Sequence, residues 1–247
     1  MVLITGGGQG IGRELARQYA AAGAIPVVAD LRLDTAERVK GEIVAAGGRA
    51  SAAHVDIADA ASLDALVCSV TEEHGRLDVL VNNAAIFATL DKRPFDELPL
   101  DQWELVMRVN ITGPFLTTRA VLPLMRAAKW GRIINISSDA VTKGVANYLH
   151  YVTSKSAVIG MTNAMARELG PDGITVNCVR PGPVATEVER THNPTVELRT
   201  RQLAQQCIPR GMEPPDLVGI VMFLSTPAAS FITGQTIACD GGYTHSS

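Results

Sequence analysis

The chain has 247 residues, a formal charge of -3, and 47% apolar against 19% charged residues. This composition supplies a buried core and excludes disordered and coiled-coil chains. Basic and acidic residues are interspersed, so no electrostatic footprint for nucleic acid or an anionic membrane appears. We therefore expect one globular domain of unusual size, whose partners are small molecules.

Short apolar, β-branched runs alternate with amphipathic stretches along the whole chain and predict strands. The runs are residues 2–4, 25–29, 50–55, 79–81, 132–136, 174–179 and 236–238. They are almost continuously apolar, which is typical of strands covered on both faces, and strand–helix alternation implies parallel pairing through right-handed crossovers. The sequence thus predicts an α/β fold: a doubly wound parallel sheet in three α/β/α layers, formed by residues 1–247 as a single domain.

Two later segments depart from this alternation. The stretch from Pro183 to Pro215 has no clear strand, and such an insertion in a single-domain enzyme predicts a substrate lid. The stretch from Leu217 to Cys239 carries no charge, but only its first part is strongly apolar, so we expect a helix followed by a strand rather than a membrane span.

The N-terminal sequence predicts the cellular location of the protein, and the spacing of the cysteines predicts their redox state. Val2-Leu3-Ile4 enters a strand at once, without the features of a signal peptide, which predicts a cytoplasmic protein. The cysteines lie far apart in apolar runs and have no metal-ligand spacing; they are Cys68, Cys178, Cys207 and Cys239. This pattern predicts reduced core cysteines rather than a disulfide framework or a zinc site.

A glycine-rich turn, residues 5–12, links the first predicted strand directly to a helical pattern. Gly6, Gly10 and Gly12 stand at i, i+4 and i+6, which is not the strict dinucleotide spacing. Glycines let backbone N–H groups approach an anion closely, and the helix N-terminus adds partial positive charge. The turn therefore predicts a pyrophosphate site, although glycines can also simply reverse the chain.

Two acidic residues follow the next strands. Asp30 ends the second strand, at the distance where a carboxylate meets the adenosine ribose hydroxyls of NAD and repels the extra phosphate of NADP. We therefore expect NAD, while Arg13 and Arg32 are near enough in sequence to keep NADP open. Asp56 follows the third strand, where it either meets the adenine edge or caps a turn.

Tyr151 and Lys155 stand four residues apart in a helical pattern and so share one face. A lysine ammonium nearby favours the phenolate and lowers the pKa of a tyrosine, so that the pair can exchange a proton with an alcohol or a carbonyl. Ser138, after the fifth strand, can hydrogen-bond the same oxygen. Spacing alone favours a solvated helix face, so only the convergence with the other motifs supports the catalytic interpretation.

Taken together, these residues resemble the single-domain branch of the short-chain dehydrogenases/reductases over essentially the whole chain. The resemblance is carried by Thr5-Gly6-x-x-x-Gly10-x-Gly12, Asp30, Asp56, Asn82-Asn83-Ala84, Asn110, Ser138, Tyr151-x-x-x-Lys155 and Pro181-Gly182. It implies a Rossmann fold and a catalytic set: Tyr151 as general acid/base, Lys155 lowering its pKa, Ser138 positioning the substrate oxygen, and Asn110 completing a water-linked proton path.

The resemblance also implies a cofactor site. Its expected residues are Gly6, Gly10, Ile11, Gly12, Asp30, Asp56, Ile57, Asn83, Tyr151, Lys155, Pro181, Gly182 and Thr186. Two departures from the family pattern stand out. Ala85 replaces the usual glycine after Asn82-Asn83-Ala84, from which we expect a small backbone adjustment. The N-terminus begins later than is usual in the family, so we expect a short first strand or a natural start further upstream.

The second half is similar to bacterial family members that oxidise secondary alcohols such as 1-phenylethanol; residues 130–135, 150–151 and 231–236 carry the likeness. A substrate pocket is expected between residues 86–93, residues 139–148 and the lid. Asp139, Asn147 and Tyr148 favour a hydroxylated substrate over a purely aromatic one. His150 could reach this pocket or simply start a helix.

The sequence therefore predicts an NAD-dependent short-chain alcohol dehydrogenase or ketone reductase. The remaining histidines have no ligand spacing, so we expect no metal. The alternative is a non-catalytic NAD-binding redox sensor or regulator, which needs no complete catalytic set. The resemblance further implies a homotetramer formed through the helices beginning near Asp101 and Tyr151 and through the last strand.

Overall fold

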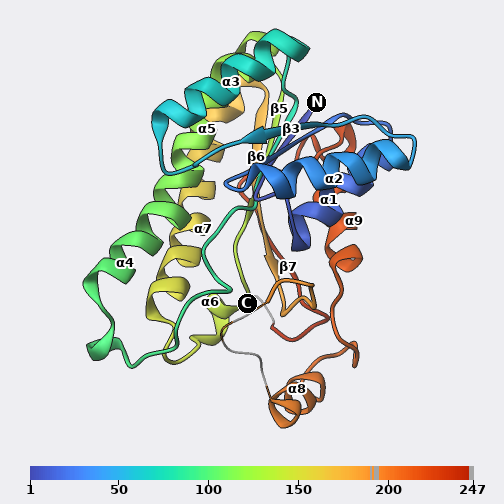
Figure 1. Ribbon diagram of the computed structural model, residues 1–247. Helices are drawn as coiled ribbons and strands as arrows, with labels where there is room; N and C mark the ends of the chain where they lie inside the picture. Colours follow the sequence, from blue (N-terminus) through green and yellow to red (C-terminus); the bar gives the residue numbers. More distant parts are fainter. Residues whose placement is uncertain (190, 192–194, 245–247) are drawn as a thin grey trace.

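The computed structural model describes residues 1–189, 191 and 195–244. Its centre is a seven-stranded parallel sheet of order β3-β2-β1-β4-β5-β6-β7 (Figure 1). The strands are β1 (Val2–Thr5), β2 (Pro26–Asp30), β3 (Ser51–His54), β4 (Val79–Asn82), β5 (Gly131–Ile136), β6 (Ile174–Pro181) and β7 (Thr236–Cys239). All seven predicted strands are confirmed, with ends that differ by one or two residues.

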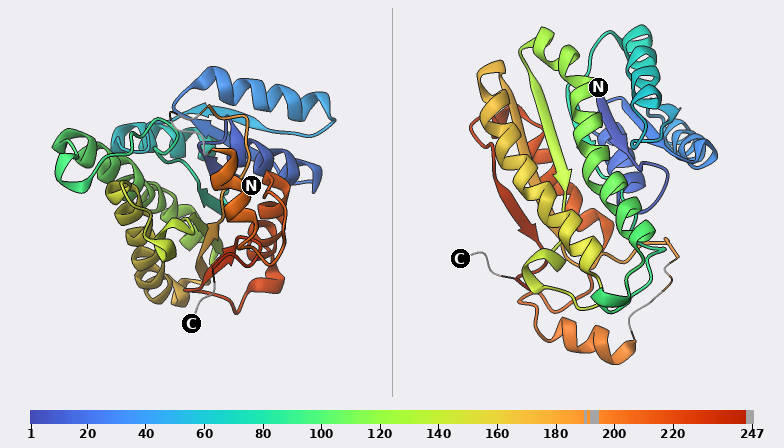
Figure 2. Two further views of the ribbon diagram at one scale, coloured as in Figure 1. Left: turned by 90° about the horizontal axis from the view of Figure 1, so that it is seen from below. Right: turned by 90° about the vertical axis from the view of Figure 1, so that its left-hand side faces the viewer.

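Helices cover both faces of the sheet (Figures 1 and 2). One face carries α1 (Gly10–Ala21), α2 (Leu33–Ala45) and α9 (Pro214–Leu224), and the other carries α3 (Ala60–His74), α5 (Gly113–Ala128) and α7 (Leu149–Leu169). Each layer buries an apolar helix stripe against its own sheet face, which stabilises both elements. The predicted doubly wound, three-layer architecture is confirmed.

β1 lies between β2 and β4 in the sheet. The strand order therefore reverses at β1: β2 and β3 follow on one side of it, and β4 to β7 follow on the other. Such a switch point opens a crevice at the carboxyl ends of the strands, where α/β proteins bind ligands. Thr5 pairs in register with Ala29, and Ile4 with Val81, which brings the ends of three strands to one edge. β1 has four residues, as do β3, β4 and β7.

The structure also contains shorter elements. They are η1 (Phe95–Glu97), α4 (Leu100–Met107), η2 (Arg108–Thr112), α6 (Ala140–Lys143), η3 (Gly170–Asp172), α8 (Val196–Leu203) and η4 (Pro227–Ala229). The segment predicted as a lid contains α8, which stands apart from both helix layers (Figure 1). The stretch from Leu217 to Cys239 forms most of α9 and all of β7, as predicted. Within the described ranges, the structure has no helix with the length and apolarity of a membrane span.

The cysteines are free thiols, but the expectation that all four lie in the core was wrong. Cys178 is buried in β6 and Cys239 is half-buried in β7, whereas Cys68 and Cys207 are exposed. Cys68 lies on the outward face of α3, because the buried positions of that helix are Leu63, Leu66 and Val70. An apolar sequence neighbourhood did not distinguish the two faces of this helix.

Candidate active site

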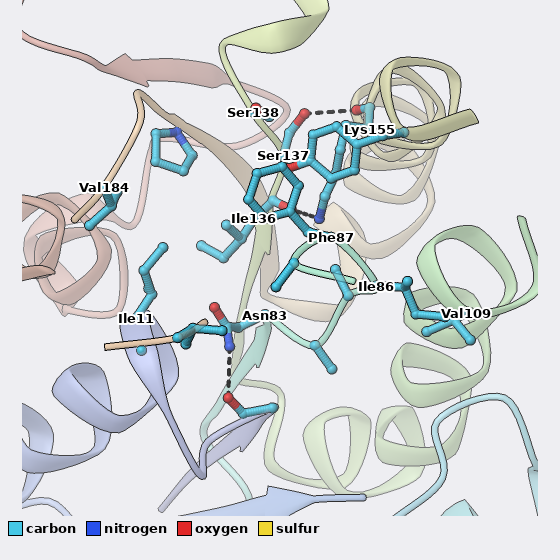
Figure 3. Close-up of a pocket in the computed structure, with 18 of the residues that line it drawn as sticks. Ile11, Asn83, Ile86, Phe87, Val109, Ile136, Ser137, Ser138, Lys155 and Val184 are labelled. Carbon is cyan, nitrogen blue, oxygen red and sulfur yellow. Dashed lines mark hydrogen bonds between the residues drawn. The ribbon is translucent and has the colours of Figure 1, made fainter. Parts of the chain in front are cut away.

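A cavity of about 770 Å³ opens where the loops after the central strands meet. This volume lies in the range of small-molecule and cofactor sites. Nearly all of the catalytic and cofactor residues implied by the family resemblance line it; the exceptions are Gly12 and Asn110. Figure 3 shows Ile11 and Asn83 at one end, and Ser138, Lys155 and Phe87 at the other. The folded chain therefore brings the glycine turn and the Tyr151 region to the same cavity.

The glycine turn after β1 requires its glycines for two physical reasons. Gly6 and Gly10 have φ values of +63° and +56°, which side chains rarely adopt. A Cβ on Gly12 would lie 2.1 Å from the carbonyl oxygen of Gly6, so the helix can begin here only without one. Asn83 fixes the turn by donating from Nδ2 to the carbonyl oxygens of Thr5 and Gly6, each at 3.0 Å.

A carboxylate already stands at the N-terminus of α1. The backbone N–H of Gly10 donates to Glu187 Oε1 at 3.1 Å, and the Arg13 guanidinium lies 3.4 Å from the same oxygen. Burial acts to raise the pKa of Glu187, but backbone hydrogen bonds and the charge of Arg13 bring it below its usual value. This oxygen stands where a phosphate oxygen could accept the same N–H, so the turn fits the pyrophosphate of a dinucleotide. Sequence analysis missed Glu187 because it lies in an irregular segment.

Asp30 lies at the end of β2 and lines the cavity, as predicted. Its Oδ2 accepts from the N–H of Gly8 at 2.9 Å, and its Oδ1 accepts from the N–H of Arg32 at 3.0 Å. Two arginines surround it: Arg32 donates to Gln9, and Arg38 donates to the carbonyl oxygen of Gly8. The site therefore holds both a fixed carboxylate that can meet ribose hydroxyls and cations close to it.

The other proposed cofactor residues also line the cavity. Asp56 does so while its Oδ1 caps a local turn by accepting from the N–H of Ala58 at 2.9 Å. The predicted turn cap is confirmed, and contact with adenine stays a prediction. The neighbouring Ile57 is buried, and its side chain packs so closely on Gly113 that a Cβ there would lie 2.5 Å from Ile57 Cδ1. Pro181 ends β6, Gly182 and Thr186 follow it, and all three line the cavity.

Tyr151 and Lys155 lie on the first turns of α7, and Ser138 follows β5; all three are buried and line the cavity. The Nζ of Lys155 lies 6.0 Å from the ring centroid of Tyr151. Ser138 Oγ accepts from the N–H of Ala140 at 3.2 Å and donates to Asp139 Oδ1 at 3.5 Å. The folded chain therefore brings the three side chains to one cavity.

Burial sets the chemistry of Lys155. Its Nζ donates to the carbonyl oxygen of Ile136 at 2.8 Å, as Figure 3 shows. Burial lowers the pKa of Lys155 to about 8, and nearby Cys178 acts in the opposite direction. Burial also raises the pKa of the Cys178 thiol to about 11, so the thiol stays neutral at pH 7. At neutral pH the ammonium of Lys155 is charged and favours the anionic form of a nearby phenol.

Asn110 lies in the single π-helical turn η2, between α4 and α5, and is 1% exposed. Its Oδ1 accepts from the N–H of Ile86 at 2.8 Å, and its Nδ2 donates to the Ile86 carbonyl and to Ser154 Oγ. The side chain thus ties the loop after β4 to α7 behind the cavity wall. Its part in a proton path stays a prediction.

Ala85 takes the place of the family's usual glycine without strain. Among the described non-glycine residues, only Lys129 and Asn147 have positive φ. The backbone after β4 therefore needs no left-handed residue at position 85, and the expected adjustment is small.

Aromatic and charged side chains line the outer part of the cavity. The ring of Phe87 lies 4.8 Å from that of Tyr151, and Tyr148 meets both rings nearly edge-on. Asp139 forms an ion pair with Lys143, whose Nζ lies 3.2 Å from the ring centroid of Tyr243. Sequence analysis named Asp139 and Tyr148 but missed Lys143, which the i, i+4 spacing could have suggested, and Tyr243, for which the sequence gives no signal.

Asn147, which we expected in the substrate pocket, lies elsewhere, and of the two placements left open for His150 the structure shows the helix start. Asn147 is exposed and does not line the cavity, because it forms a left-handed turn whose carbonyl accepts from Arg93. His150 is fully buried behind the cavity wall, and burial lowers its pKa. It therefore acts as a packed residue at the start of α7.

Metal binding was not expected from the histidine spacing. Across the residues that the structure describes, no three His, Cys, Asp or Glu side chains are grouped to hold a metal ion. His192 and His245 lie outside the described residues, so the prediction remains untested there.

Comparisons with known proteins identify the relatives of this fold and site. A family model described as "Enoyl-(Acyl carrier protein) reductase" matches residues 6–244. A 3-oxoacyl-[acyl-carrier-protein] reductase from Synechocystis is 41% identical, covering 98% of this chain and 96% of the relative. Meso-2,3-butanediol dehydrogenase from Serratia marcescens is 34% identical, with coverage of 100% and 95%.

The solved structures agree. The crystal structure of a 3-oxoacyl-[acyl-carrier protein] reductase from Brucella melitensis with bound NAD superposes with a TM-score of 0.88 at 35% identity, over 99% of this chain and 91% of that one. The match spans the glycine turn, the sheet and α7 together. The chain therefore belongs to the short-chain dehydrogenase/reductase family of oxidoreductases.

Proposed function

We propose that this oxidoreductase transfers a hydride between NAD(H) and a secondary alcohol or its ketone, with Tyr151 as the general acid/base. The observation that carries the proposal is the meeting of buried Ser138, Tyr151 and Lys155 at the cavity that also contains the glycine turn. Meso-2,3-butanediol dehydrogenase, whose name describes a secondary-alcohol reaction, supports the substrate class.

Side chains of this protein would carry out the proton transfer that accompanies hydride transfer. In oxidation, the phenolate of Tyr151 takes the hydroxyl proton of the alcohol, and in reduction the phenol returns it to the ketone oxygen. The charge of Lys155 stabilises the phenolate, and Ser138 donates a hydrogen bond to the substrate oxygen as negative charge develops on it. The nicotinamide ring, when bound, supplies the hydride chemistry.

NAD rather than NADP is the proposed cofactor, and the support is the fixed carboxylate of Asp30. Its two oxygens are held by the N–H groups of Gly8 and Arg32, so the carboxylate is oriented in advance for ribose hydroxyls. A phosphate at that position would face a negative charge. The nearby Arg32 and Arg38 side chains are the groups that a phosphate could use instead.

We also propose that the segment from Pro183 to Pro215 closes over bound substrate. Val184, Thr186, Val188 and Gln202 of this segment line the cavity, which supports a lid. Closure of such a segment excludes water from the reacting atoms.

A homotetramer stays part of the proposal. Exposed apolar side chains on three helices support it: Leu100 and Leu105 on α4, Phe115 on α5 and Leu149 on α7. Exposed apolar groups gathered in this way are typical of protein interfaces. Light scattering of the purified protein measures the number of subunits. The cytoplasmic location likewise stays a prediction.

The direct test is an assay of purified protein with NAD and a panel of secondary alcohols, and with NADH and the matching ketones. Appearance or loss of reduced-cofactor absorbance would support the proposal. Tight NAD binding without turnover of any alcohol or ketone would overturn it in favour of the redox sensor or regulator.

A further inference from the structure

A buried ion pair stands beside the proposed reacting atoms without taking part in the proton transfer. Asp139 follows Ser138 directly, and Lys143 lies one helical turn further along α6. Both line the cavity. Asp139 is 6% exposed, and the side chain of Lys143 is 22% exposed. Removing two charges from water costs free energy that their mutual attraction often does not recover. An ion pair kept in a substrate cavity therefore suggests a role in ligand binding.

The C-terminal segment holds this pair in place. Asp240, just after β7, accepts hydrogen bonds from the N–H groups of Gly242, Tyr243 and Thr244 at 2.9–3.2 Å. The resulting turn sets the ring of Tyr243 3.2 Å from Lys143 Nζ, so the ammonium lies between an aromatic face and the Asp139 carboxylate. The position of Lys143 is therefore fixed from two sides.

The distance to Ser138 locates the group that this pair can bind. Ser138 Oγ donates a hydrogen bond to Asp139 Oδ1 at 3.5 Å. Ser138 is the proposed partner of the reacting oxygen, so a group bound by Asp139 can lie next to that oxygen. Oxygens on adjacent carbons, in the gauche arrangement, are separated by roughly the length of a hydrogen bond. A substituent on the neighbouring carbon fits this spacing.

The charges of the pair select the chemistry of that substituent. The carboxylate of Asp139 accepts a hydrogen bond and the ammonium of Lys143 donates one. A hydroxyl can satisfy both groups at once, whereas an anion would face Asp139 and a cation would face Lys143. Two further cations that line the cavity, Lys92 and Arg108, are exposed.

We propose that Asp139 and Lys143 bind a second hydroxyl on the carbon next to the reacting one, so that the substrate is a vicinal diol or the matching α-hydroxy ketone. This inference rests on the proposed function. The rings of Phe87 and Tyr148 provide an apolar surface in the same cavity for the carbon skeleton. Asp139 and Lys143 are then specificity residues, and proton transfer is left to Tyr151.

The test compares substrates that differ by one hydroxyl. Wild-type protein with NAD is assayed on 2,3-butanediol against 2-butanol and on trans-1,2-cyclohexanediol against cyclohexanol; with NADH, acetoin is compared with 2-butanone. We expect kcat/KM to favour the hydroxylated member of each pair by at least ~10²-fold, because the mono-alcohol leaves a buried polar pair without its partner.

Variants of Asp139 and Lys143 then test whether this ion pair causes the preference for diols over mono-alcohols. Asp139→Ala should lower the diol-to-monoalcohol ratio of kcat/KM at least ~10-fold, and Asp139→Asn, which keeps an acceptor oxygen, should lower it less. The double variant Asp139→Leu with Lys143→Met leaves no buried charge unpaired, so it tests the same point if a single variant fails to fold. Asp172→Ala is the matched control, since it removes a carboxylate from a surface ion pair with Arg126.

The possible outcomes separate the two proposals. A fall in the diol-to-monoalcohol ratio of kcat/KM in the variants supports the inference, and an unchanged or higher ratio overturns it. An equal loss on both members of a pair would assign the ion pair a structural role and overturn it. Wild-type turnover of mono-alcohols without diol preference, or a preference for 3-hydroxybutanoate over the diols, would overturn it while leaving the dehydrogenase assignment intact. Absence of turnover on every alcohol and ketone would instead reject the proposed function itself.

Discussion

Glu187 Oε1 accepts a hydrogen bond from the backbone N–H of Gly10 at 3.1 Å, at the N-terminus of α1. A dinucleotide pyrophosphate would compete with this carboxylate for the same donor. We expect Glu187→Ala to lower the Kd for NADH roughly three- to tenfold, in line with the free energy of one exposed charge-assisted hydrogen bond. A fluorescence titration of each protein with NADH measures this Kd.

The neighbouring Glu189→Ala serves as the control, because Glu189 is an exposed glutamate of the same segment. Its Kd should match the wild-type value. Weaker binding in Glu187→Ala would mean that this carboxylate helps to order the site rather than competing with the cofactor.

Tyr151→Phe removes the phenolic hydroxyl and keeps the ring that packs against Phe87. Without the proton-exchanging group, kcat should fall at least ~10²-fold. The Kd for NADH should change little. Steady-state kinetics and NADH titration measure the two effects separately.

Tyr19→Phe is a matched control, because it removes a buried tyrosine hydroxyl that hydrogen-bonds Ser225, away from the cavity. It should keep nearly full activity. Undiminished turnover in Tyr151→Phe would remove the role assigned to this residue.

Lys155→Met should abolish most activity yet stabilise the fold at pH 7. Burial lowers the pKa of Lys155 from 10.5 to about 8, so the charged form costs about 3 kcal/mol in the folded state, of which about 1 is offset by the hydrogen bond to Ile136. The variant should therefore gain about 2 kcal/mol in free energy of unfolding at pH 7. Urea unfolding curves at several pH values measure this difference.

The pH dependence has a definite sign. The unfolded chain keeps the lysine proton up to its ordinary pKa of 10.5, whereas the folded chain loses it from about pH 8. The burial cost is therefore fully present below pH 8 and shrinks as the pH rises toward 10.5, so wild type and variant should converge there. The exposed Lys40→Met serves as the control and should show no such trend. A variant less stable than wild type at pH 7 would contradict the predicted cost.

Asp30→Asn removes the negative charge beside Arg32 and Arg38 and keeps an oxygen that can accept a backbone N–H. Wild type should prefer NAD. In the variant, the ratio of kcat/KM for NADP to that for NAD should rise at least ~10-fold, because repulsion of the extra phosphate is lost. The exposed Asp64→Asn makes the same charge change on α3 and should leave the ratio unchanged. An unchanged ratio in Asp30→Asn would assign cofactor choice to other groups.

The fold followed from the sequence because buried parallel strands leave a direct pattern. Runs such as residues 2–4 and 79–81 are apolar at every position, and the alternation of such runs with helical stretches fixes parallel pairing. Cys68 shows the limit of that reasoning. The rotation of α3 against the sheet decides its exposure, and the short apolar sequence around it did not reveal that rotation.

The sequence alone determined the doubly wound sheet, the glycine turn, and the residues from Asp30 to Lys155 that line the cavity, because strand ends and helical spacing are local properties of the chain. Only the tertiary structure brought Glu187 to Gly10 and Tyr243 to Lys143. Those contacts join segments far apart in sequence through irregular loops, whose paths depend on packing against the whole molecule. The same packing placed Asn147 outside the expected substrate pocket and decided that His150 starts α7 without reaching that pocket.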